Sequence, residues 1–420
     1  MAKYKSFDFL KKIYFVRTGG SQEELKAAEL IKAECESIGI PAWLEEFSVD
    51  RPVIKKAHLK FSNPDFEPEC VGVGMSGSTP EEGISGEFIY IDSIPSAEIN
   101  DVKDKICLIH QKIVRPDIYK ILINKGAKGL ILCTGDVYLK DKDVDLDPYI
   151  YRDKVYKFGK IPAVCIRMKD AEKILNASPK QASFVMLEDE KQENSRNVVC
   201  EIKGTELPDE IIGFTAHFDS VPFSKGAFDN GTGSTTILQM LDYFKNNPPK
   251  RTLRFVWCGS EEMGLLGSQA YVSAHKEEIQ NKFKLIVNVD MTGVTLGFDI
   301  ACVTGPTSLV NDINYFGKEV GFPIKARQGV YSSDSSPFAD VGIPAISFAR
   351  LSPQGGARIH SHIDVIERLN AKPYYKTIDF IAKISSKWIN SVAFPIPKEI
   401  PQNMVDELDY YFYRKERPDK

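Results

Sequence analysis

Strand-like and helical segments alternate regularly in the second half of this 420-residue chain. After Arg196, four apolar runs predict strands: EIIGFTAHF, TLRFVWCG, KLIVNVDMTG and IPAISFAR. Helical patterns cover four segments between and after these runs: residues 231–246, 262–278, 307–320 and 371–391. Nearly continuous apolar strands joined by helices are typical of a parallel sheet that is covered on both faces. We therefore expect an α/β fold with a mixed, mostly parallel sheet sandwiched by helices.

The first half of the chain has a different pattern. A capping-box pair, Ser21 and Glu24, begins a helix, and a short strand is expected near residues 42–48. Residues 55–194 then carry short strands, turn residues and one amphipathic helix. A chain of 420 residues is longer than one core usually supports, so two domains are expected. We expect a discontinuous α/β domain of residues 1–54 and 195–395, an inserted smaller, β-rich α/β domain of residues 55–194, and a C-terminal extension of residues 396–420.

Composition argues against several classes of protein. The chain is 43% hydrophobic and 27% charged, with a formal net charge of −4, so it offers no strongly basic surface to nucleic acid. Its apolar runs are too short to span a bilayer, and its start does not resemble a signal peptide. The eight cysteines include no C-x-x-C pair and mostly lie in strand-like runs, so free thiols are expected. Together these features favour a cytoplasmic protein without a nucleic-acid or membrane partner.

Side chains that bind metal ions follow three of the predicted strands. His217 ends one strand, Asp290 ends another, and the adjacent Glu261 and Glu262 follow a third. Open α/β sheets bind ligands outside the carboxyl ends of their strands, so we expect these side chains at one edge of the sheet. Two neighbouring glutamates in that position are costly unless cations or a proton neutralise them. A solvated helix N-terminus remains the ordinary alternative for this glutamate pair.

Two further segments complete a set of residues that could hold two metal ions. Asp229 lies in the glycine-flanked loop GAFDNGTGS, where a carboxylate could bridge two ions. The segment RIHSHIDV offers both His360 and His362. Asp219 follows His217 by two residues, on the same side of the strand and within reach of the second imidazole nitrogen. A carboxylate in that place fixes the tautomer and raises the basicity of the metal-binding nitrogen.

The chemistry that this set of residues predicts is metal-assisted hydrolysis. Histidine, aspartate and glutamate suit zinc, with cobalt or manganese as alternatives. Two such ions acidify water and polarise a carbonyl group, and a carboxylate free of metal must take up a proton and return it to the leaving amine. We expect Glu261 in that role and Glu262 as a ligand.

The combined segments resemble the co-catalytic di-zinc aminopeptidases of metallopeptidase family twenty-eight. The matching segments are RNVVCEIKG, AHFDS, GAFDNGTG, WCGSEEMGLLGS, NVDMTG, HSHID, and the run that begins at Asp334 and continues as SSPFADVGIPAISF. The family pattern His-[Ser/Thr]-x-x-[Asp/Glu] favours His360 over His362 as the last ligand. The resemblance implies two zinc ions, one held by His217 and Asp290 and the other by Glu262 and His360, with Asp229 as the bridge.

The resemblance also implies roles for residues that do not bind metal. Glu261 would be the general base that acts on a metal-bridged water, and Asp219 would support His217. A cis peptide bond is implied between Asp229 and Asn230. Residues 55–194 resemble an inserted protease-associated (PA) domain.

The residue that stabilises the oxyanion is less well defined, because the chain departs from the family pattern. Relatives often carry tyrosine immediately before the last histidine ligand, where this chain has Ile359. They often carry histidine where this chain has Ser335. Tyr331 resembles an alternative donor used by other members, and Arg358 is a second candidate.

We expect a zinc exopeptidase, and the leading hypothesis is an aminopeptidase. Its partner would be a peptide with a free N-terminus, and a homodimer is left open. A carboxypeptidase or amidohydrolase of the same di-zinc fold is the alternative, because Arg350 and Arg358 could bind a substrate carboxylate. A third reading, a non-catalytic receptor-like binding module, is disfavoured because the chain keeps both the ligands and the base.

Overall fold

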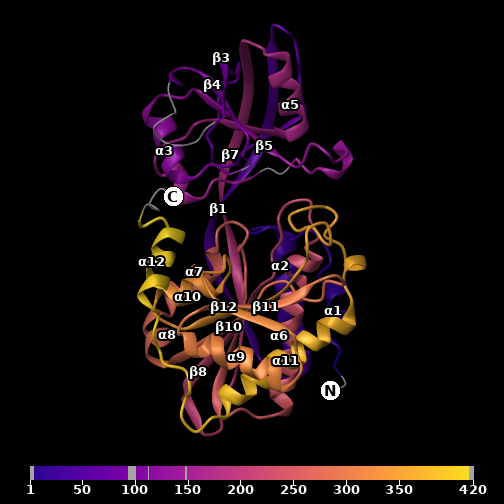
Figure 1. Ribbon diagram of the computed structural model, residues 1–420, viewed down its shortest axis with the longest axis vertical. Helices are drawn as coiled ribbons and strands as arrows, with labels where there is room; N and C mark the ends of the chain where they lie inside the picture. The colour runs from indigo at the N-terminus through magenta and orange to yellow at the C-terminus, as the bar shows by residue number, and fades with distance from the viewer. Residues whose placement is uncertain (1–3, 93–100, 112, 147–148, 416–420) are drawn as a thin grey trace. The chain divides into compact units, whose positions relative to one another are not determined.

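The computed structural model describes residues 4–92, 101–111, 113–146 and 149–415, which form two compact units (Figure 1). The first unit comprises Met1–Val49 and Glu193–Lys420, and the second comprises Asp50–Gln192. The chain passes from one unit to the other within the long strands β1 (Ala42–Ser62) and β7 (Gln181–Ile202). Residues 396–420, expected as an extension, fall within the first unit. The PA-like identity of the second unit stays a prediction.

A mixed sheet forms the centre of the first unit. Its strands are β7, β8 (Leu207–His217), β9 (Arg251–Cys258), β10 (Phe283–Val289), β11 (Phe298–Thr304), β12 (Ile324–Gln328) and β13 (Ala345–Leu351), in the order β12-β11-β13-β10-β8-β9-β7. Four pairings, β8–β9, β8–β10, β10–β13 and β11–β12, are parallel. The pairings β11–β13 and β7–β9 are antiparallel. The mostly parallel sheet predicted from the sequence is therefore confirmed.

Helices cover both faces of this sheet (Figure 1). One face packs against α1 (Ser6–Phe9), α2 (Gln22–Ile38), α6 (Thr232–Asn246), α9 (Thr307–Glu319) and α11 (Ala371–Ile389). The other face packs against α7 (Leu266–Ala274), α8 (Lys276–Lys282), α10 (Ser335–Asp340) and α12 (Gln402–Tyr411). Single turns occur at η1 (Leu10–Lys12), η2 (Asp141–Asp143), η3 (Ala227–Gly231) and η4 (Ile366–Arg368).

Alternation along the central strands divides the core between the two faces. On β9, Phe255 and Trp257 pack on the α6 side, whereas Val256 and Cys258 pack on the α7 side. In the parallel pairing of β8 with β9, His217 lies opposite Cys258 at the last position. Both strands therefore end together, and the residues that follow them meet at the same edge of the sheet.

The helix expected over residues 262–278 is the main local error of the sequence-based prediction. The structure has a turn after β9 and then two helices, α7 and α8, with α7 beginning only at Leu266. Ser260, Gly264 and Leu265 have φ values of 51°, 122° and 63°, which a right-handed helix does not allow. The strands β11 and β12 were also not expected. β12 (IKARQ) is a short edge strand with alternating polar residues, which gives little apolar signal.

The second unit has a sheet of its own. Its strand order is β7-β3-β4-β5-β6-β2, with β2 (Cys70–Gly72), β3 (Ile84–Ile91), β4 (Ile106–Ile109), β5 (Gly129–Thr134) and β6 (Ala163–Arg167). Strands β3 to β6 are parallel to one another, whereas β2 and β7 pair antiparallel at the edges. The expected helix is α3 (Pro116–Asn124); α4 (Asp153–Tyr156) and α5 (Met168–Ala177) were not expected.

Two general expectations can be compared with the described residues. All eight cysteines lie in this part of the chain, and each is a free thiol, as expected. Within the described ranges, no helix combines the length and the apolar character that crossing a membrane requires. The cytoplasmic location stays a prediction.

Candidate metal centre

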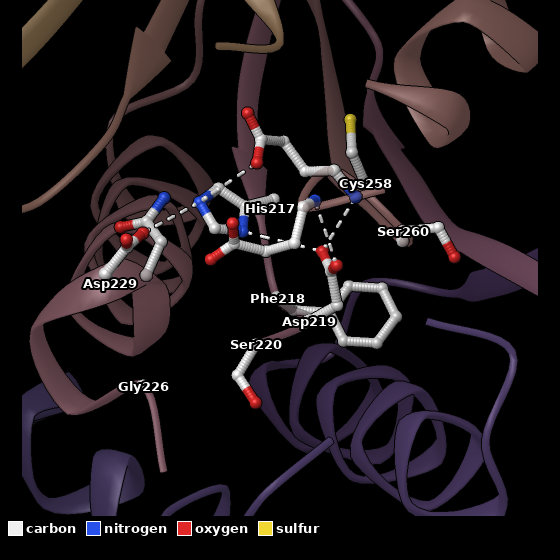
Figure 2. A network of polar contacts seen from close by, with 12 residues as sticks. His217, Phe218, Asp219, Ser220, Gly226, Asp229, Cys258 and Ser260 are labelled. Atoms are coloured by element: carbon white, nitrogen blue, oxygen red, sulfur yellow. Dashed lines mark hydrogen bonds and ion pairs between the residues drawn. The ribbon is translucent and has the colours of Figure 1, made fainter. Parts of the chain in front are cut away.

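The first half of the candidate centre surrounds His217, whose ring lies between Asp219 and Asp229 (Figure 2). Nδ1 of His217 is 3.5 Å from Asp219 Oδ1, as the strand spacing predicted. Nε2 is 3.2 Å from Asp229 Oδ1 and 3.6 Å from Asp290 Oδ1. A ring nitrogen carries at most one proton and cannot donate well to two carboxylates at once. A cation between the nitrogen and both oxygens accounts better for this arrangement.

The second half surrounds His360 and shares Asp229 with the first. His360 Nε2 is 3.1 Å from Asp229 Oδ2 and 3.0 Å from Glu262 Oε2. One oxygen of Asp229 thus faces each histidine. The His360 side chain is 40% exposed, so the cluster opens toward solvent on this side. Among the described residues, the two groups that could hold a metal ion are His217–Asp229–Asp290 and Asp229–Glu262–His360, and neither includes His362.

Two observations test whether these residues fit divalent metal ions. Within the described part of the chain, Asp290 Oδ1 and Glu262 Oε1 are buried without a hydrogen-bond partner, which is costly for a carboxylate oxygen unless a cation binds it. The spacings of 3.0–3.6 Å between facing atoms also match the edge of a tetrahedron whose bonds are about 2.0–2.1 Å, roughly 3.3 Å. The residues therefore fit two divalent ions.

The electrostatics of the cluster indicate an excess of negative charge. Burial alone would lower the pKa of His217, yet the surrounding carboxylates, Glu261 foremost, raise it well above its usual value. Burial also opposes protonation of His360, but Asp229 and Glu262 raise its pKa to about 11. Burial raises the pKa of Glu261 and of Glu262. Two dications would neutralise these carboxylates directly.

Asp219 has a second function that the sequence pattern did not predict. Its Oδ1 accepts a hydrogen bond from Glu261 N at 2.9 Å, and its Oδ2 accepts one from Glu262 N at 3.2 Å. The same carboxylate lies beside the His217 ring. Asp219 therefore couples the end of β8 to the turn that carries both glutamates.

Asp364 holds the loop of Asp229 in a similar way. Its Oδ1 accepts from Phe228 N at 2.7 Å, and its Oδ2 accepts from Asp229 N at 3.0 Å. Burial raises the pKa of Asp364 to about 7. Asp364, the last residue of the segment HSHID, therefore ties the segment of His360 to the backbone of Asp229, the candidate bridging residue.

Asn230 ties the same loop to the end of β10. Its Oδ1 accepts from Gly233 N and from Met291 N, and its Nδ2 donates to Val289 O. These bonds bring Asp290, between Val289 and Met291, next to the loop of Asp229. The peptide bond between Asp229 and Asn230 is cis, as the resemblance implied.

Arg17 supports two of these segments, a role that was not predicted from the sequence pattern. Its guanidinium is fully buried. Within the described residues, all of its hydrogen bonds go to carbonyl oxygens. Those carbonyls belong to Ile13, Phe15, Phe218, Lys225 and Gly226. Burial lowers the pKa of Arg17 to about 10, so it remains charged at neutral pH beside the acidic cluster. A single arginine far from the motifs gives no local signal of such a role.

The remaining predicted residues have mixed outcomes. Burial, and then the nearby charges of Asp290 and Asp229, raise the pKa of Tyr331. Arg350 pairs with Asp299 at 2.6 Å and donates to Val294 O. The guanidinium of Arg350 is therefore already engaged in contacts inside the fold. The roles of Tyr331 and Arg358 stay predictions.

The sheet edge gathers two histidines and a set of carboxylates that could hold metal ions, an arrangement typical of metal-dependent hydrolases with an α/β fold. A sequence profile described as peptidase family M28 matches residues 197–385, which contain all five candidate ligands. Over this segment, which is just under half of its length, the chain is therefore similar to peptidase family M28.

Individual relatives extend the similarity beyond this segment. The chain is 28% identical to aminopeptidase YwaD of Bacillus subtilis over 364 residues, which cover 84% of this chain and 76% of the relative. It is 27% identical to carboxypeptidase Q of Bos taurus, covering 64% of this chain and only 58% of that protein. The crystal structure of BSAP, a zinc aminopeptidase from Bacillus subtilis, superposes with a TM-score of 0.75, 23% identity and coverage of 94% and 98%. That superposition supports the fold.

Arg17→Lys tests the support that the N-terminal segment gives to the centre. Lysine has three donors where Arg17 contacts five carbonyls, and a buried polar group left unpaired costs about 1–3 kcal/mol. We expect the free energy of unfolding of the first unit to fall by about 2–4 kcal/mol. Urea unfolding followed by tryptophan fluorescence measures it, because all three tryptophans lie in that unit.

The matched control for this prediction is Arg368→Lys, at an exposed position. It should change stability by no more than about 0.5 kcal/mol. Equal stability of the two variants would contradict the role assigned to Arg17.

Proposed function

We propose that the chain is a zinc-dependent aminopeptidase that removes the N-terminal residue of peptides. The observation that carries the proposal is the division of Asp229 between two histidine groups, one on each of its oxygens. This arrangement suits two neighbouring ions rather than one. The match of residues 197–385 to the peptidase family M28 profile and the similarity to an aminopeptidase over 84% of the chain support the same interpretation.

The candidate ligands divide as the geometry groups them. His217 and Asp290 would hold one zinc ion, Glu262 and His360 would hold the other, and Asp229 would bridge both. Bound ions of this kind supply Lewis acidity to the scissile carbonyl and lower the pKa of water. Asp219, Asp364 and Asn230 keep the ligand-bearing loops in place through backbone hydrogen bonds.

Glu261 is the proposed general base. It is 8% exposed and belongs to neither ligand group among the described residues, yet its Oε2 is 4.0 Å from His217 Nε2. Burial raises its pKa, which strengthens it as a proton acceptor. Glu261 can therefore take a proton from water at the reacting carbon and return it to the leaving amine.

Tyr331 is the proposed oxyanion donor. The nearby charges of Asp290 and Asp229 help to raise its pKa, so its phenol stays protonated and can donate a hydrogen bond. Such a donor stabilises the charge that develops on the carbonyl oxygen.

The charge of the centre favours a substrate ammonium over a substrate carboxylate. Six acids, Asp219, Asp229, Glu261, Glu262, Asp290 and Asp364, contribute one negative charge each when ionised. Two dications and Arg17 together supply five positive charges, which leaves one negative charge in excess. Arg350, one candidate for binding a substrate carboxylate, is already paired with Asp299. A carboxypeptidase remains the second candidate because of the similarity to carboxypeptidase Q.

A substrate panel with metal removal tests the proposed function. Aminoacyl-anilides with a free α-amine should be hydrolysed, whereas their N-acetylated forms should not. A chelator should abolish the activity, and zinc should restore it. The chelated protein should also unfold at a lower temperature, because the ligand carboxylates then repel one another. Preference for acetylated substrates would rule out the aminopeptidase.

Glu261→Gln tests the general base. We expect both metal ions to remain bound while kcat falls by several powers of ten, beyond the roughly 10²–10⁴-fold typical of acid–base help. The loss is large because Glu261 moves the proton twice. Steady-state kinetics and metal analysis measure the two effects. Glu277→Gln, an exposed glutamate on α8, is the control and should match the wild type. Retained activity in Glu261→Gln would show that the base is misassigned.

His360→Ala and His362→Ala form a matched pair that tests the last ligand. His360 Nε2 faces two ligand carboxylates, whereas His362 belongs to neither ligand group. We expect His360→Ala to bind one zinc ion and His362→Ala to bind two, as measured by elemental analysis after dialysis. The opposite result would move the ligand role to His362.

A further inference from the structure

The turn after β9 is held by buried carboxylates at three successive N–H groups. Asp219 accepts from Glu261 N and Glu262 N. Ser260 N, immediately before them, donates to Glu24 Oε1 at 3.1 Å. Glu24 lies in the first turn of α2, 236 residues away in sequence and outside the segment that the family profile matches.

Glu24 divides its two oxygens between two tasks. Ser21 and Glu24 form the capping pair of α2, in which Ser21 Oγ accepts from Glu24 N. Oε2 of Glu24 serves the start of this helix by accepting from Gly20 N at 3.0 Å. Oε1 serves the turn instead, accepting from Ser260 N and also from the hydroxyls of Ser260 and Ser195.

The contact between Glu24 and the turn is close and fully buried. Glu24 and Ser260 are both fully buried. A Cβ atom added to Gly259 would lie 2.7 Å from Glu24 Oε1, and one added to Gly19 would collide with Ser260 Oγ. The N-terminal segment therefore packs directly on the backbone that leads into Glu261. Without Glu24, the buried N–H of Ser260 would lose its acceptor, and the left-handed conformation of Ser260 would lose its support.

We propose that Glu24 is a positioning residue of the active site, whose carboxylate fixes Ser260 and thereby the placement of Glu261 and Glu262. This inference rests on the proposed function for the roles of those two glutamates. A displacement of about 1 Å in a catalytic group can cost roughly 10²-fold in rate. Loss of the Glu24 carboxylate should therefore affect both proton transfer by Glu261 and metal binding by Glu262.

The test compares two variants of the same capping pair in the full-length, zinc-loaded protein. Glu24→Ala removes the bond from Gly20 N and the contact with the turn, but it leaves the bond from the backbone N of residue 24 to Ser21 Oγ. Ser21→Ala removes the cap alone, since the Ser21 hydroxyl contacts Glu24 N rather than the turn. We expect Glu24→Ala to lower kcat by about 10–100-fold with KM changed less than about twofold. Ser21→Ala should keep kcat within about twofold of the wild type while lowering the unfolding temperature.

A second measurement does not depend on activity. Titration with a chelator reports the affinity for each zinc ion, and Glu24→Ala should bind one of the two ions about tenfold more weakly. Ser21→Ala should bind both ions like the wild type. In a Glu261→Gln background, Glu24→Ala should change kcat by less than about twofold. Proton transfer by residue 261, the step that Glu24 is proposed to support, is already lost in that background. If Glu24→Ala does not fold, Glu24→Asp replaces it, since the shorter side chain cannot reach both Gly20 and Ser260.

Two outcomes would overturn the inference. One is a Glu24→Ala protein, or its Glu24→Asp replacement, whose kcat and zinc affinities equal those of the wild type. The other is a Ser21→Ala protein that loses as much kcat as Glu24→Ala, which would assign the effect to the helix cap alone. A wild type that binds two zinc ions but does not hydrolyse free-amine substrates would instead refute the proposed function, and the chelator titration would still test Glu24.

Discussion

Hydrogen bonds from loop backbones to buried carboxylates are the interaction on which the rest of the centre depends. The three carboxylates among the candidate ligands carry like charges and would separate if their loops were free. Asp219 holds the turn of Glu261 and Glu262, and Asp364 holds the loop of Asp229. Each of these acids thus adds negative charge and restrains backbone at the same time. The buried guanidinium of Arg17, which among the described residues donates to carbonyl oxygens, lies near these acids and offsets part of that charge.

The fold and the candidate ligands were predictable because their signals are local. Three of the four predicted apolar strands end at a candidate metal-binding residue or just before one, as His217 and Asp290 show. The rule that ligands collect at the carboxyl ends of parallel strands then brings these residues together. The two groups in the structure contain the five residues that the resemblance assigned to metal.

The supporting residues were not predictable because their partners are distant in sequence. Glu24 was visible only as a helix cap, and the contact with Ser260 depends on how α2 packs against the end of β9. No sequence motif around Arg17 indicated its supporting role. The helix expected from residue 262 was wrong for a related reason: Asp219 draws two N–H groups into a turn, and tertiary contacts override helix propensity there.

The split of the first unit around residues 50–192 has a consequence for how such a chain can vary. All candidate ligands lie within residues 197–385, yet that stretch alone would lack the side chains that fill the spaces beside Phe218, Gly226 and Ser260. The short N-terminal arm and the long C-terminal stretch therefore complete a single compact unit that neither could form alone. The intervening unit can grow, shrink or diverge between them at small entropic expense, since closing a longer excursion costs only logarithmically more.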